Sequence, residues 1–463
     1  MANESLRILA PDPKTHMPEV LELVSKVFDM PDGYYQARKR FRRRLIGPTD
    51  FLDPVTSRVG LLDGRIVTFV GVWDYQMRIG TARLRTAGIG MVATHGDYRK
   101  RGLMDRTFRV CMDAAREQGY DLSVLFGIEN FYDPYGFVPA WPETVWEADT
   151  AALPAERPHP PASRLAAARS DALWKIFNRE NATLTGTAVR PTRTKTPYSK
   201  APLLMGWNGP GDQLAGYTMT MCKGDVLEWI ESGGDPGQVL RVLGSLARRC
   251  KCKMVRFHHL HPRHPLCVLL RRGNCRARTT YQRSGGAMVR TVNLLSTLRK
   301  MEGELTRRLK TPDPSDRSDR SDRSDRSDRS DRSDRSDRSD RSDRSDRSDR
   351  SDRSDRSDRS DRSDGSTSVL IADKRDTCLL QIERSRVRVA GAPERLPGQS
   401  AGASGPTTNT IRGGNHVAQL LIGTGDPWEI AEAARMRVTG EARSLLPVLF
   451  PAQEPQLNAW DRF

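Results

Sequence analysis

The residues best suited to chemistry form a basic turn directly after an apolar segment. The chain reads Gly88-Ile-Gly-Met-Val-Ala-Thr-His-Gly-Asp-Tyr-Arg-Lys-Arg-Gly102-Leu-Met-Asp-Arg106, which predicts a strand, a glycine-containing turn and a helix start. The first backbone N–H groups of a helix have no partner within it, and the helix dipole adds partial positive charge. Arg99, Lys100 and Arg101 add further charge. Gly102 allows a close approach of the ligand, so the sequence predicts a site for a pyrophosphate group.

A second group of side chains follows this turn. An apolar face at helical spacing starts at Met104 and stops at Gln118-Gly119, as a helix end should. Asp121 to Phe126 then predicts a buried strand, and Glu129-Asn-Phe-Tyr-Asp-Pro-Tyr-Gly-Phe137 comes directly after it. Cys111 lies on the apolar face of the helix, which indicates a core residue rather than a nucleophile.

The composition of the turn excludes two common nucleotide-binding motifs. It has neither the Gly-Lys-Ser/Thr ending of a P-loop nor the three spaced glycines of a dinucleotide-binding fold. It resembles the Arg-x-x-Gly-x-Ala/Gly segment by which Gcn5-related N-acetyltransferases (the GNAT family) bind the pyrophosphate of acetyl-coenzyme A. Arg99 and Gly102 stand at the matching positions, and Met104 replaces the usual small residue. A basic helix start without a ligand is the alternative.

The segment 129–137 strengthens this resemblance. It is similar to a shortened form of the family signature Asn-x-x-x-Phe-Tyr-x-x-x-Gly-Phe. In that family the tyrosine lies beside the coenzyme sulfur, so the resemblance implies that Tyr132 is catalytic; an aromatic core residue before a turn is the alternative. We expect Phe131, Tyr135 and Phe137 to be such core residues.

Length and composition set limits on the whole chain. At 463 residues it is too long for one compact core, which indicates two or three domains. No apolar run approaches the roughly 18 residues of a membrane span, and the N-terminus lacks a signal sequence, so we expect a cytoplasmic protein without membrane contact. Seven cysteines, an odd number in a long chain, favour reduced thiols over a disulfide framework.

The net charge is +17, and none of it comes from the sixteen Ser-Asp-Arg units at 315–362, where each Asp cancels an Arg. A basic excess suits an anionic cofactor. The arginine-rich clusters 38–44 and 248–276 have no stacking-aromatic module or helix-turn-helix pattern beside them, so we expect a solvated basic surface and no nucleic acid partner. The repeat segment 315–364 has no apolar residue to bury and is expected to be a disordered insertion without function.

The order of predicted elements indicates an α+β protein with mixed sheets and three domains. Residues 1–145 contain a hairpin signal at Asp63-Gly64 and then strand, turn, helix and strand, the acetyltransferase order. Residues 146–290 resemble a second, degenerate copy, in which a glycine-rich turn with Asp235 replaces the basic one, so we expect no cofactor there. Residues 291–463 resemble a sterol-carrier-protein-like domain. The predicted helices include 34–45 and 238–249, and the predicted strands include 66–73, 213–223 and 378–389.

This domain order is similar to that of the enhanced-intracellular-survival (Eis-like) acetyltransferases of bacteria. The motif Thr94-His-x-x-x-Arg-Lys-Arg-Gly-Leu-Met and the ending Trp460-Asp-Arg-Phe463 fit that family best. In it the terminal carboxylate enters the active site as a base, which implies this role for Phe463; a frayed terminus is the alternative. The resemblance also implies acetyl-coenzyme A as co-substrate and a homo-oligomer, hexameric in relatives. The implied coenzyme-binding residues are Val92, Ala93, Thr94, Arg99, Lys100, Arg101, Gly102, Leu103, Met104, Asp105 and Asn130.

Transfer of an acetyl group from a thioester to a primary amine needs a neutral amine, a polarised carbonyl and a proton for the thiolate. The resemblance gives these tasks to the Phe463 carboxylate, the N–H groups of residues 92–94 and the Tyr132 hydroxyl. The acceptor would be a small polyamine, an aminoglycoside-like compound or a protein lysine, although Arg462 and the 38–44 cluster weigh against a polycation. The side chains expected to wall the acceptor pocket are Phe28, Asp29, Tyr34 and Tyr35.

Two alternatives compete with this interpretation. A catalytically silent binding or lipid-carrier protein could keep the same folds. A zinc site is the second alternative, but its candidate ligands match no Cys-x₂-Cys or His-x₃-His spacing, so we expect no metal, and the resemblance places 258–264 in a surface loop. Those candidate ligands are Cys250, Cys252, His258, His259, His261, His264, Cys267 and Cys275.

Overall fold

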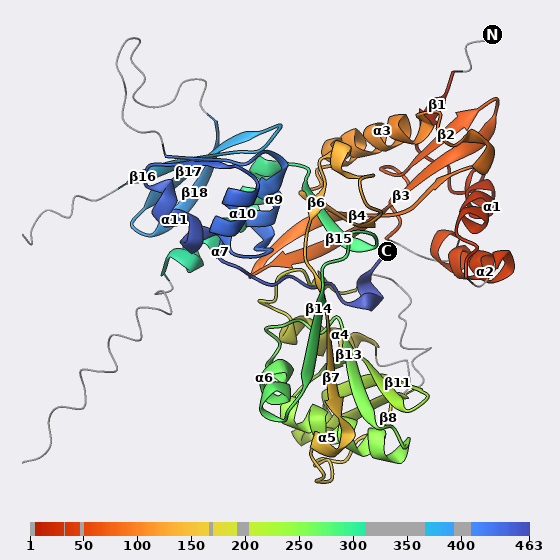
Figure 1. Ribbon diagram of the computed structural model, residues 1–463, viewed down its shortest axis with the longest axis vertical. Coiled ribbons are helices and arrows are strands. Elements are labelled where there is room, and N and C mark those ends of the chain that lie inside the picture. The colour runs from red at the N-terminus through yellow and green to blue at the C-terminus, as the bar shows by residue number, and fades with distance from the viewer. Residues whose placement is uncertain are drawn as a thin grey trace, which may run out of the picture.

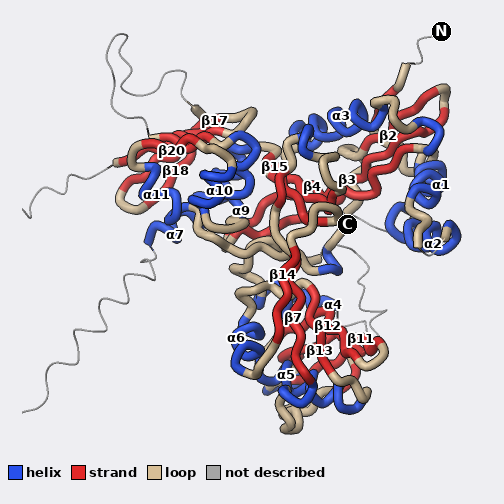
Figure 2. Tube along the Cα trace, in the orientation of Figure 1, coloured by secondary structure: helices blue, strands red, loops and turns tan. Residues whose placement is uncertain are grey.

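The computed structural model describes residues 5–31, 33–46, 51–165, 170–191, 203–310, 366–392 and 409–463. The predicted insertion at 315–364 lies outside these ranges. The described residues form three units, each built on its own β-sheet (Figure 1). Strands form the centre of each unit and helices pack against them (Figure 2). The architecture is therefore mixed α/β, as predicted.

The first unit carries the predicted turn. Its strands follow the order β1-β2-β3-β4-β5-β15-β6, and β9 also pairs with β3. The neighbouring strands β4 and β5 are parallel and are joined by α3. Helices α1 and α2 pack on one face of this sheet, and α3 packs on the other. The elements are β1 (Arg7–Leu9), α1 (Met17–Val27), α2 (Tyr34–Leu45), β2 (Arg58–Leu62), β3 (Arg65–Ile79), β4 (Ala82–Thr94), α3 (Leu103–Glu117), β5 (Leu122–Gly127), β6 (Val138–Pro139), β9 (Ala188–Val189) and β15 (Gly286–Thr291).

The second unit repeats one feature of the first. Its sheet has the order β14-β7-β13-β12-β11-β10-β8, and its parallel pair β12 and β13 is also joined by a helix, α5. The Asp235 side chain caps α5 by accepting a hydrogen bond from the Gln238 N–H. The elements are β7 (Glu143–Asp149), β8 (Ser163–Arg164), α4 (Ser170–Glu180), β10 (Leu203–Asn208), β11 (Leu214–Lys223), β12 (Val226–Gly233), α5 (Pro236–Arg249), β13 (Met254–His258), α6 (Pro265–Arg272) and β14 (Arg276–Thr280).

The third unit contains a smaller sheet with the order β18-β17-β16-β19-β20. Its α7 packs against β17, β18 and also β4, so one apolar core runs from the first unit into the third. The elements are α7 (Leu294–Lys310), β16 (Thr367–Ala372), β17 (Thr377–Glu383), β18 (Arg386–Gly391), β19 (Thr410–Arg412), α9 (Val417–Ile422), α10 (Pro427–Ala433), β20 (Arg437–Thr439) and α11 (Ala442–Leu449). The predicted single strand 378–389 is a hairpin instead, because Arg384 and Ser385 adopt the left-handed conformation of a tight turn (φ 47° and 62°).

Two of the predicted domain boundaries do not coincide with the sheets. Strand β7 starts at Glu143 and already belongs to the second sheet. Strand β15, which a boundary at 290 assigns to the second unit, pairs with β5 and β6 in the first sheet. The reason is that an apolar segment shows in sequence that it is a strand, but not which distant edge it will pair with.

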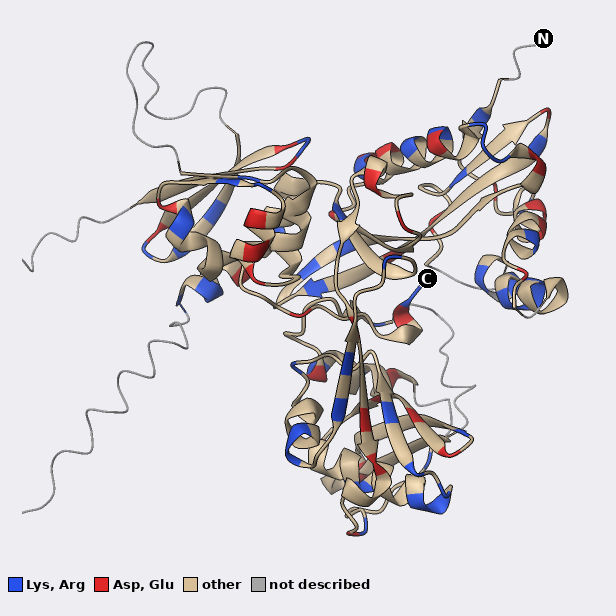
Figure 3. Cartoon of the chain, viewed as in Figure 1, with Lys and Arg blue, Asp and Glu red and all other residues tan. Residues whose placement is uncertain are grey.

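Charge is spread over all three units. Figure 3 shows Lys and Arg interspersed with Asp and Glu on each of them. Helix α2 is rich in arginine, but Arg38 lies 3.9 Å from Glu22 of α1. Within the described ranges no helix combines the length and the apolar character needed to cross a lipid bilayer.

Candidate active site

A gap between β4 and β5 forms the centre of the candidate site. The two strands pair from Thr86–Leu122 to Ile89–Leu125, but β4 continues to Thr94. A register shift against β3 and a positive φ at Met91 (51°) bend β4 at this point. Beyond Ile89, β4 has no pairing with β5, so its outward main-chain groups are left for a ligand. Such unpaired main-chain groups can bind a ligand that carries amide groups of its own.

The basic turn lies at the end of the same strand. Gly102 adopts a left-handed conformation (φ 71°) as the N-cap of α3, and no side chain caps the helix. Leu103 and Met104 are buried in two neighbouring apolar clusters of the first unit, and this packing fixes the first turn of α3. Arg99 and Lys100 are exposed around it. The first N–H groups of α3 are therefore presented with positive charge beside them, which fits a diphosphate.

Tyr132 follows the C-terminal end of β5 in the chain. It directly precedes the short helix η2 (Asp133–Tyr135), and its ring packs against Gly127, Phe108 and Phe131. Burial raises the pKa of Tyr132 to about 12, so the hydroxyl is protonated at neutral pH. Tyr135 and Phe137 pack in the same cluster, as predicted for core aromatics.

Phe463 occupies the other face of the sheet at the same gap. Its ring lies over Gly88, where any Cβ would overlap it, and contacts the rings of Tyr75 and Phe126 at centroid distances of 5.7 and 6.0 Å. A Cβ on Gly90 would lie 3.2 Å from the main-chain carboxyl carbon of Phe463. The end of the chain is therefore docked rather than frayed.

The two predicted catalytic groups approach the gap from opposite sides. Ala87, Ile89 and Leu125 pack with Tyr132 on the α3 face. The alternate positions Gly88 and Phe126 contact Phe463 on the face of α1 and α2. Because neighbouring residues of a strand point to opposite faces, a group held between β4 and β5 would lie between the phenol and the carboxyl group.

The tail segment, residues 451–463, is anchored by a buried charge cluster in the second unit. Arg190 lies 3.0 Å from Asp461 of the tail and 2.8 Å from Glu231 of β12. Tyr217 donates a hydrogen bond of 2.7 Å to the same Glu231. All four residues are buried. The cluster holds the tail across the junction between the first two units, where Figure 1 shows the end of the chain.

Arg462 does not face an acceptor as an unpaired cation. Its guanidinium lies 2.6 Å from Glu143 and stacks 4.2 Å from the centroid of the Phe126 ring. Of the charges that weighed against a polycationic acceptor, that of Arg462 is therefore compensated.

Several predicted site residues lie away from the gap or make other contacts. Asp105 forms an ion pair of 2.9 Å with Arg109 one turn along α3. Asn130, at a positive φ of 61°, lines a separate cavity of about 870 Å³ where the three units meet. Arg101 stacks on Tyr98 at 5.4 Å. Val92 and Ala93 pack on opposite faces of β4, and Thr94 ends the strand.

The predicted acceptor residues gather at the end of α1 and the start of α2. Phe28 packs on Phe41 at 5.8 Å, and the Tyr34 hydroxyl donates to Glu22. Asp29 accepts a main-chain hydrogen bond from Gly33, and Tyr35 is 84% exposed. Phe41 belongs to the apolar cluster against which Phe463 packs, so these helices flank the Phe463 side of the gap.

The predicted loop is present, because β13 ends at His258 and α6 begins at Pro265, but the expectation that it lies on the surface is wrong for two of its histidines. His261 and His264 are buried, and their side chains bond within the fold: His261 contacts the Thr185 carbonyl at 3.1 Å, and His264 caps α6. Burial lowers the pKa of His261 to about 3 and that of His264 to about 4. In the described ranges, no group of three or more His, Cys, Asp or Glu side chains is arranged to hold a metal ion. Cys111 is buried with its pKa raised to about 12, as expected of a core thiol.

Sequence reasoning missed the contacts that hold Phe463. Glycines inside a strand indicate a close approach of another group, and Gly88-Ile-Gly90 carried that signal. Arg190 gave no signal, because its partners Glu231 and Asp461 are 41 and 271 residues away.

Comparison with known proteins agrees with this geometry. Residues 11–140 match the model of the acetyltransferase (GNAT) domain. The structure is similar to a GCN5-related N-acetyltransferase from Kribbella flavida, at 15% identity over 98% of this chain and 99% of that chain, with a TM-score of 0.67. A GCN5-related N-acetyltransferase from Anabaena variabilis is 12% identical over 98% of this chain and 99% of that chain, with a TM-score of 0.66. Eis1 from Mycobacterium abscessus is 11% identical over 99% of this chain and 100% of that chain, with a TM-score of 0.60. No curated protein sequence matches the chain.

At these identities the three crystal structures establish a shared fold and no more. The family match covers the gap, the basic turn and Tyr132. Residues 11–140 therefore form a GNAT acetyltransferase domain, and acyl transfer is the class of reaction that this domain supports.

Proposed function

We propose that the protein is an acetyl-coenzyme-A-dependent N-acetyltransferase that transfers the acetyl group directly to a primary amine. The observation that carries this proposal is the placement of Tyr132 and Phe463 on opposite faces of the sheet where β4 and β5 separate. The coenzyme, when bound, supplies the acetyl group as a thioester. The N–H groups at the start of α3 and the basic residues around Gly102 would hold its diphosphate.

The Phe463 carboxylate acts as the general base in this proposal. It accepts a proton from the ammonium form of the acceptor, directly or through a water, so that the neutral amine can attack the carbonyl carbon. Its position against Gly90 brings it to the strand that would hold the thioester. Positioned bases of this kind contribute about 10² to 10⁴ in rate.

Tyr132 acts on the departing sulfur. A thiol has a pKa near 8.5, and Tyr132 has a pKa of about 12, so complete proton transfer to the thiolate would cost about 5 kcal/mol. We therefore infer that the phenol stabilises the developing negative charge by donating a hydrogen bond, and that the proton released by the amine completes the thiol. The N–H groups of 92–94 would polarise the carbonyl oxygen.

The test combines two variants that leave the fold intact. Tyr132→Phe removes only the hydroxyl, and addition of one glycine after Phe463 moves the carboxylate by one residue. We expect each change to lower kcat with a primary amine acceptor at least ten-fold, while calorimetry shows unchanged affinity for acetyl-coenzyme A. Unchanged turnover in both variants would remove the mechanism. Absence of any coenzyme binding in the native protein would remove the function.

A further inference from the structure

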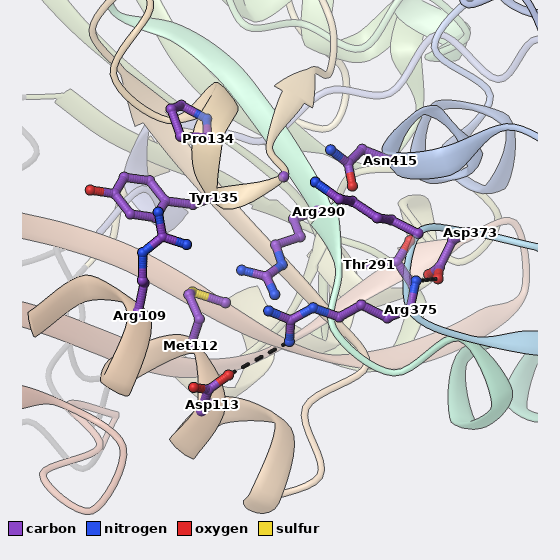
Figure 4. Close-up of a pocket in the computed structure, with 12 residues that line it drawn as sticks. Arg109, Met112, Asp113, Pro134, Tyr135, Arg290, Thr291, Asp373, Arg375 and Asn415 are labelled. Carbon is purple, nitrogen blue, oxygen red and sulfur yellow. Dashed lines mark hydrogen bonds and ion pairs between the residues drawn. The ribbon is translucent and has the colours of Figure 1, made fainter. Parts of the chain in front are cut away.

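A second site lies between the first and third units, away from the gap. A cavity of about 330 Å³ is enclosed by α3, η2, β15 and the turn between β16 and β17 (Figure 4). Four cationic side chains line it, Arg109, Arg290, Lys374 and Arg375, against two acidic ones, Asp113 and Asp373. Its lining therefore carries an excess of two positive charges.

Arg290 is the centre of this cavity. Its side chain is 5% exposed and comes from β15, a strand inside the first sheet. No carboxylate of the described residues forms an ion pair or hydrogen bond with it, and burial lowers its pKa to about 10. Figure 4 shows its guanidinium directed toward that of Arg375. A buried cation is costly unless an anion compensates it.

The neighbouring acids Asp113 and Asp373 favour the charged form of Arg290 only at a distance, because neither forms an ion pair or a hydrogen bond with it. Arg375 lies 3.6 Å from Asp113, and Arg109 lies 2.9 Å from Asp105, so each of these carboxylates forms its ion pair with an arginine other than Arg290. Asp373 accepts hydrogen bonds of 2.7 Å from the N–H groups of Arg375 and Asp376 and thereby closes its own turn. The charge of Arg290 is left facing the cavity.

A further polar group in the lining also has no partner. The Thr291 hydroxyl is buried and has no hydrogen bond to any described residue. It follows Arg290 in the chain and lies beside Arg375 in Figure 4. Because that hydroxyl has almost no surface open to the cavity, the guanidinium groups of Arg290 and Arg375 are the groups of this lining that suit phosphate oxygens.

We propose that this cavity binds the phosphate group of a small molecule, with Arg290 and Arg375 as its main ligands. A phosphate monoester carries about −1.5 to −2 charges at neutral pH, which matches the excess in the lining. The volume exceeds that of phosphate alone, so a small organic part can accompany it. The phosphate could belong to a free metabolite or to the coenzyme's ribose 3′-phosphate, because α3 carries both Arg109 and the basic turn.

The experiment measures thermal stability with inorganic phosphate and with glycerol phosphate, against sodium chloride at equal ionic strength. Three full-length proteins are compared with the native chain: Arg290→Met, Arg375→Gln and the control Arg388→Gln. Arg388 is an exposed arginine of the same unit that does not line the cavity. A ligand at a hundred times its Kd raises Tm by several degrees.

We expect the native protein and the control to gain this stabilisation and the two cavity variants to lose most of it. Phosphate bound at the start of α3 would stabilise all four proteins alike, so only the difference between them counts. If Arg290→Met does not fold, Arg375→Gln alone tests the proposal. Arg375 is half-exposed at the edge of the cavity, so we expect its substitution to leave the fold intact. Equal stabilisation of the native protein and Arg375→Gln, or none in either, would overturn the free-ligand site.

A second arm assigns the source of the phosphate. Coenzyme A and its 3′-dephospho form are titrated into the native protein and Arg375→Gln. If the variant loses ten-fold or more in affinity for coenzyme A but not for the dephospho form, the site holds the coenzyme's phosphate. If the variant changes neither these affinities nor the response to free phosphates, the proposal is wrong. This readout needs no turnover, so it stands or fails separately from the proposed acetyl transfer.

Discussion

Two glycines decide where the end of the chain can lie. Gly88 and Gly90 present bare backbone on one face of β4, and the Phe463 ring and carboxyl group occupy the space that side chains would fill. The same strand presents Ala87 and Ile89 to the α3 core on its other face. Neighbouring residues of this one strand therefore pack in the α3 core on one face and hold Phe463 on the other.

Gly88→Ala tests this separation. The added methyl overlaps the Phe463 ring, so we expect the ring to be displaced and kcat to fall about ten-fold or more, with coenzyme affinity unchanged. Steady-state kinetics and calorimetry measure the two effects. The matched control is Gly303→Ala at an exposed position of α7, where a Cβ meets no atom within 4 Å and adds up to about 1 kcal/mol of stability. Equal kcat in both variants would contradict the proposed position of the carboxylate.

At the scale of elements, the tail segment is held by contacts with residues 185–190 and by a cap within the tail itself. Arg190 fixes Asp461, Gln456 donates its N–H to Thr185, and Asn458 caps the last helical turn, η9 (Ala459–Asp461). The Arg190 cluster is buried, where loss of one partner leaves charged groups unsatisfied. The tail is therefore held by directional bonds at several points before it reaches the gap.

Asp461→Asn should loosen the tail without removing it. The charge-assisted bond to Arg190 is worth about 1.5–3 kcal/mol, so we expect release of Phe463 by carboxypeptidase to become at least ten-fold faster and kcat to fall in parallel. Glu454→Gln is the control, because Glu454 forms an exposed ion pair with Arg263 in the same segment. The anchoring role would be refuted by equal digestion rates for the native chain and Asp461→Asn.

Helix α6 carries a pH dependence of stability. Burial lowers the pKa of its cap, His264, to about 4, below the ordinary value of about 6.5. Between these two pH values the unfolded chain binds a proton that the folded chain does not. The stabilisation is therefore complete above pH 6.5 and is lost as the pH falls toward 4, by about 1.4 kcal/mol per pH unit for this one histidine.

His264→Asn keeps a capping side chain and removes the titration. We expect the free energy of unfolding, from urea titrations at pH 7.5, 6.0 and 5.0, to fall less steeply in this variant, by about 1.4 kcal/mol per pH unit. The control is His159→Asn, which makes the same substitution at an exposed histidine outside α6. A native slope in His264→Asn would show that the acid sensitivity has another source.

At the scale of the whole molecule, the three units are interlocked. Strand β15 returns to the first sheet, β9 pairs with β3, and the tail comes back from the third unit. The core shared by β3, β4 and α7 makes the first and third units one packed body. The candidate site is therefore completed only when the last residues of the chain have folded onto the first unit.

We expect the Ser-Asp-Arg repeat to contribute neither to the stability of this fold nor to catalysis. Its residues have nothing apolar to bury and no net charge, so deletion of 315–362 should leave kcat unchanged and Tm within about 2 °C. Kinetics and calorimetry of the deleted chain measure both. A lower Tm or a slower enzyme would show that the repeat contributes to the fold or to catalysis.

The sequence by itself determined the local elements. The basic turn, the amphipathic helix α3 and the helices at 34–45 and 238–249 follow from periodicity and capping, which act between residues a few positions apart. The arrangement of the basic turn could be predicted for the same reason, because its N–H groups and charges come from one continuous segment.

Only the tertiary structure decided which distant segments meet. The insertion of β15 beside β5, the burial of His261 and His264, and the cluster of Arg190 with Glu231 and Asp461 all join residues far apart in the chain. Such contacts leave no local periodicity, because strand pairing and ion pairing depend on the position of the partner rather than on the neighbours in sequence. The opposed placement of Tyr132 and Phe463 arises in this way.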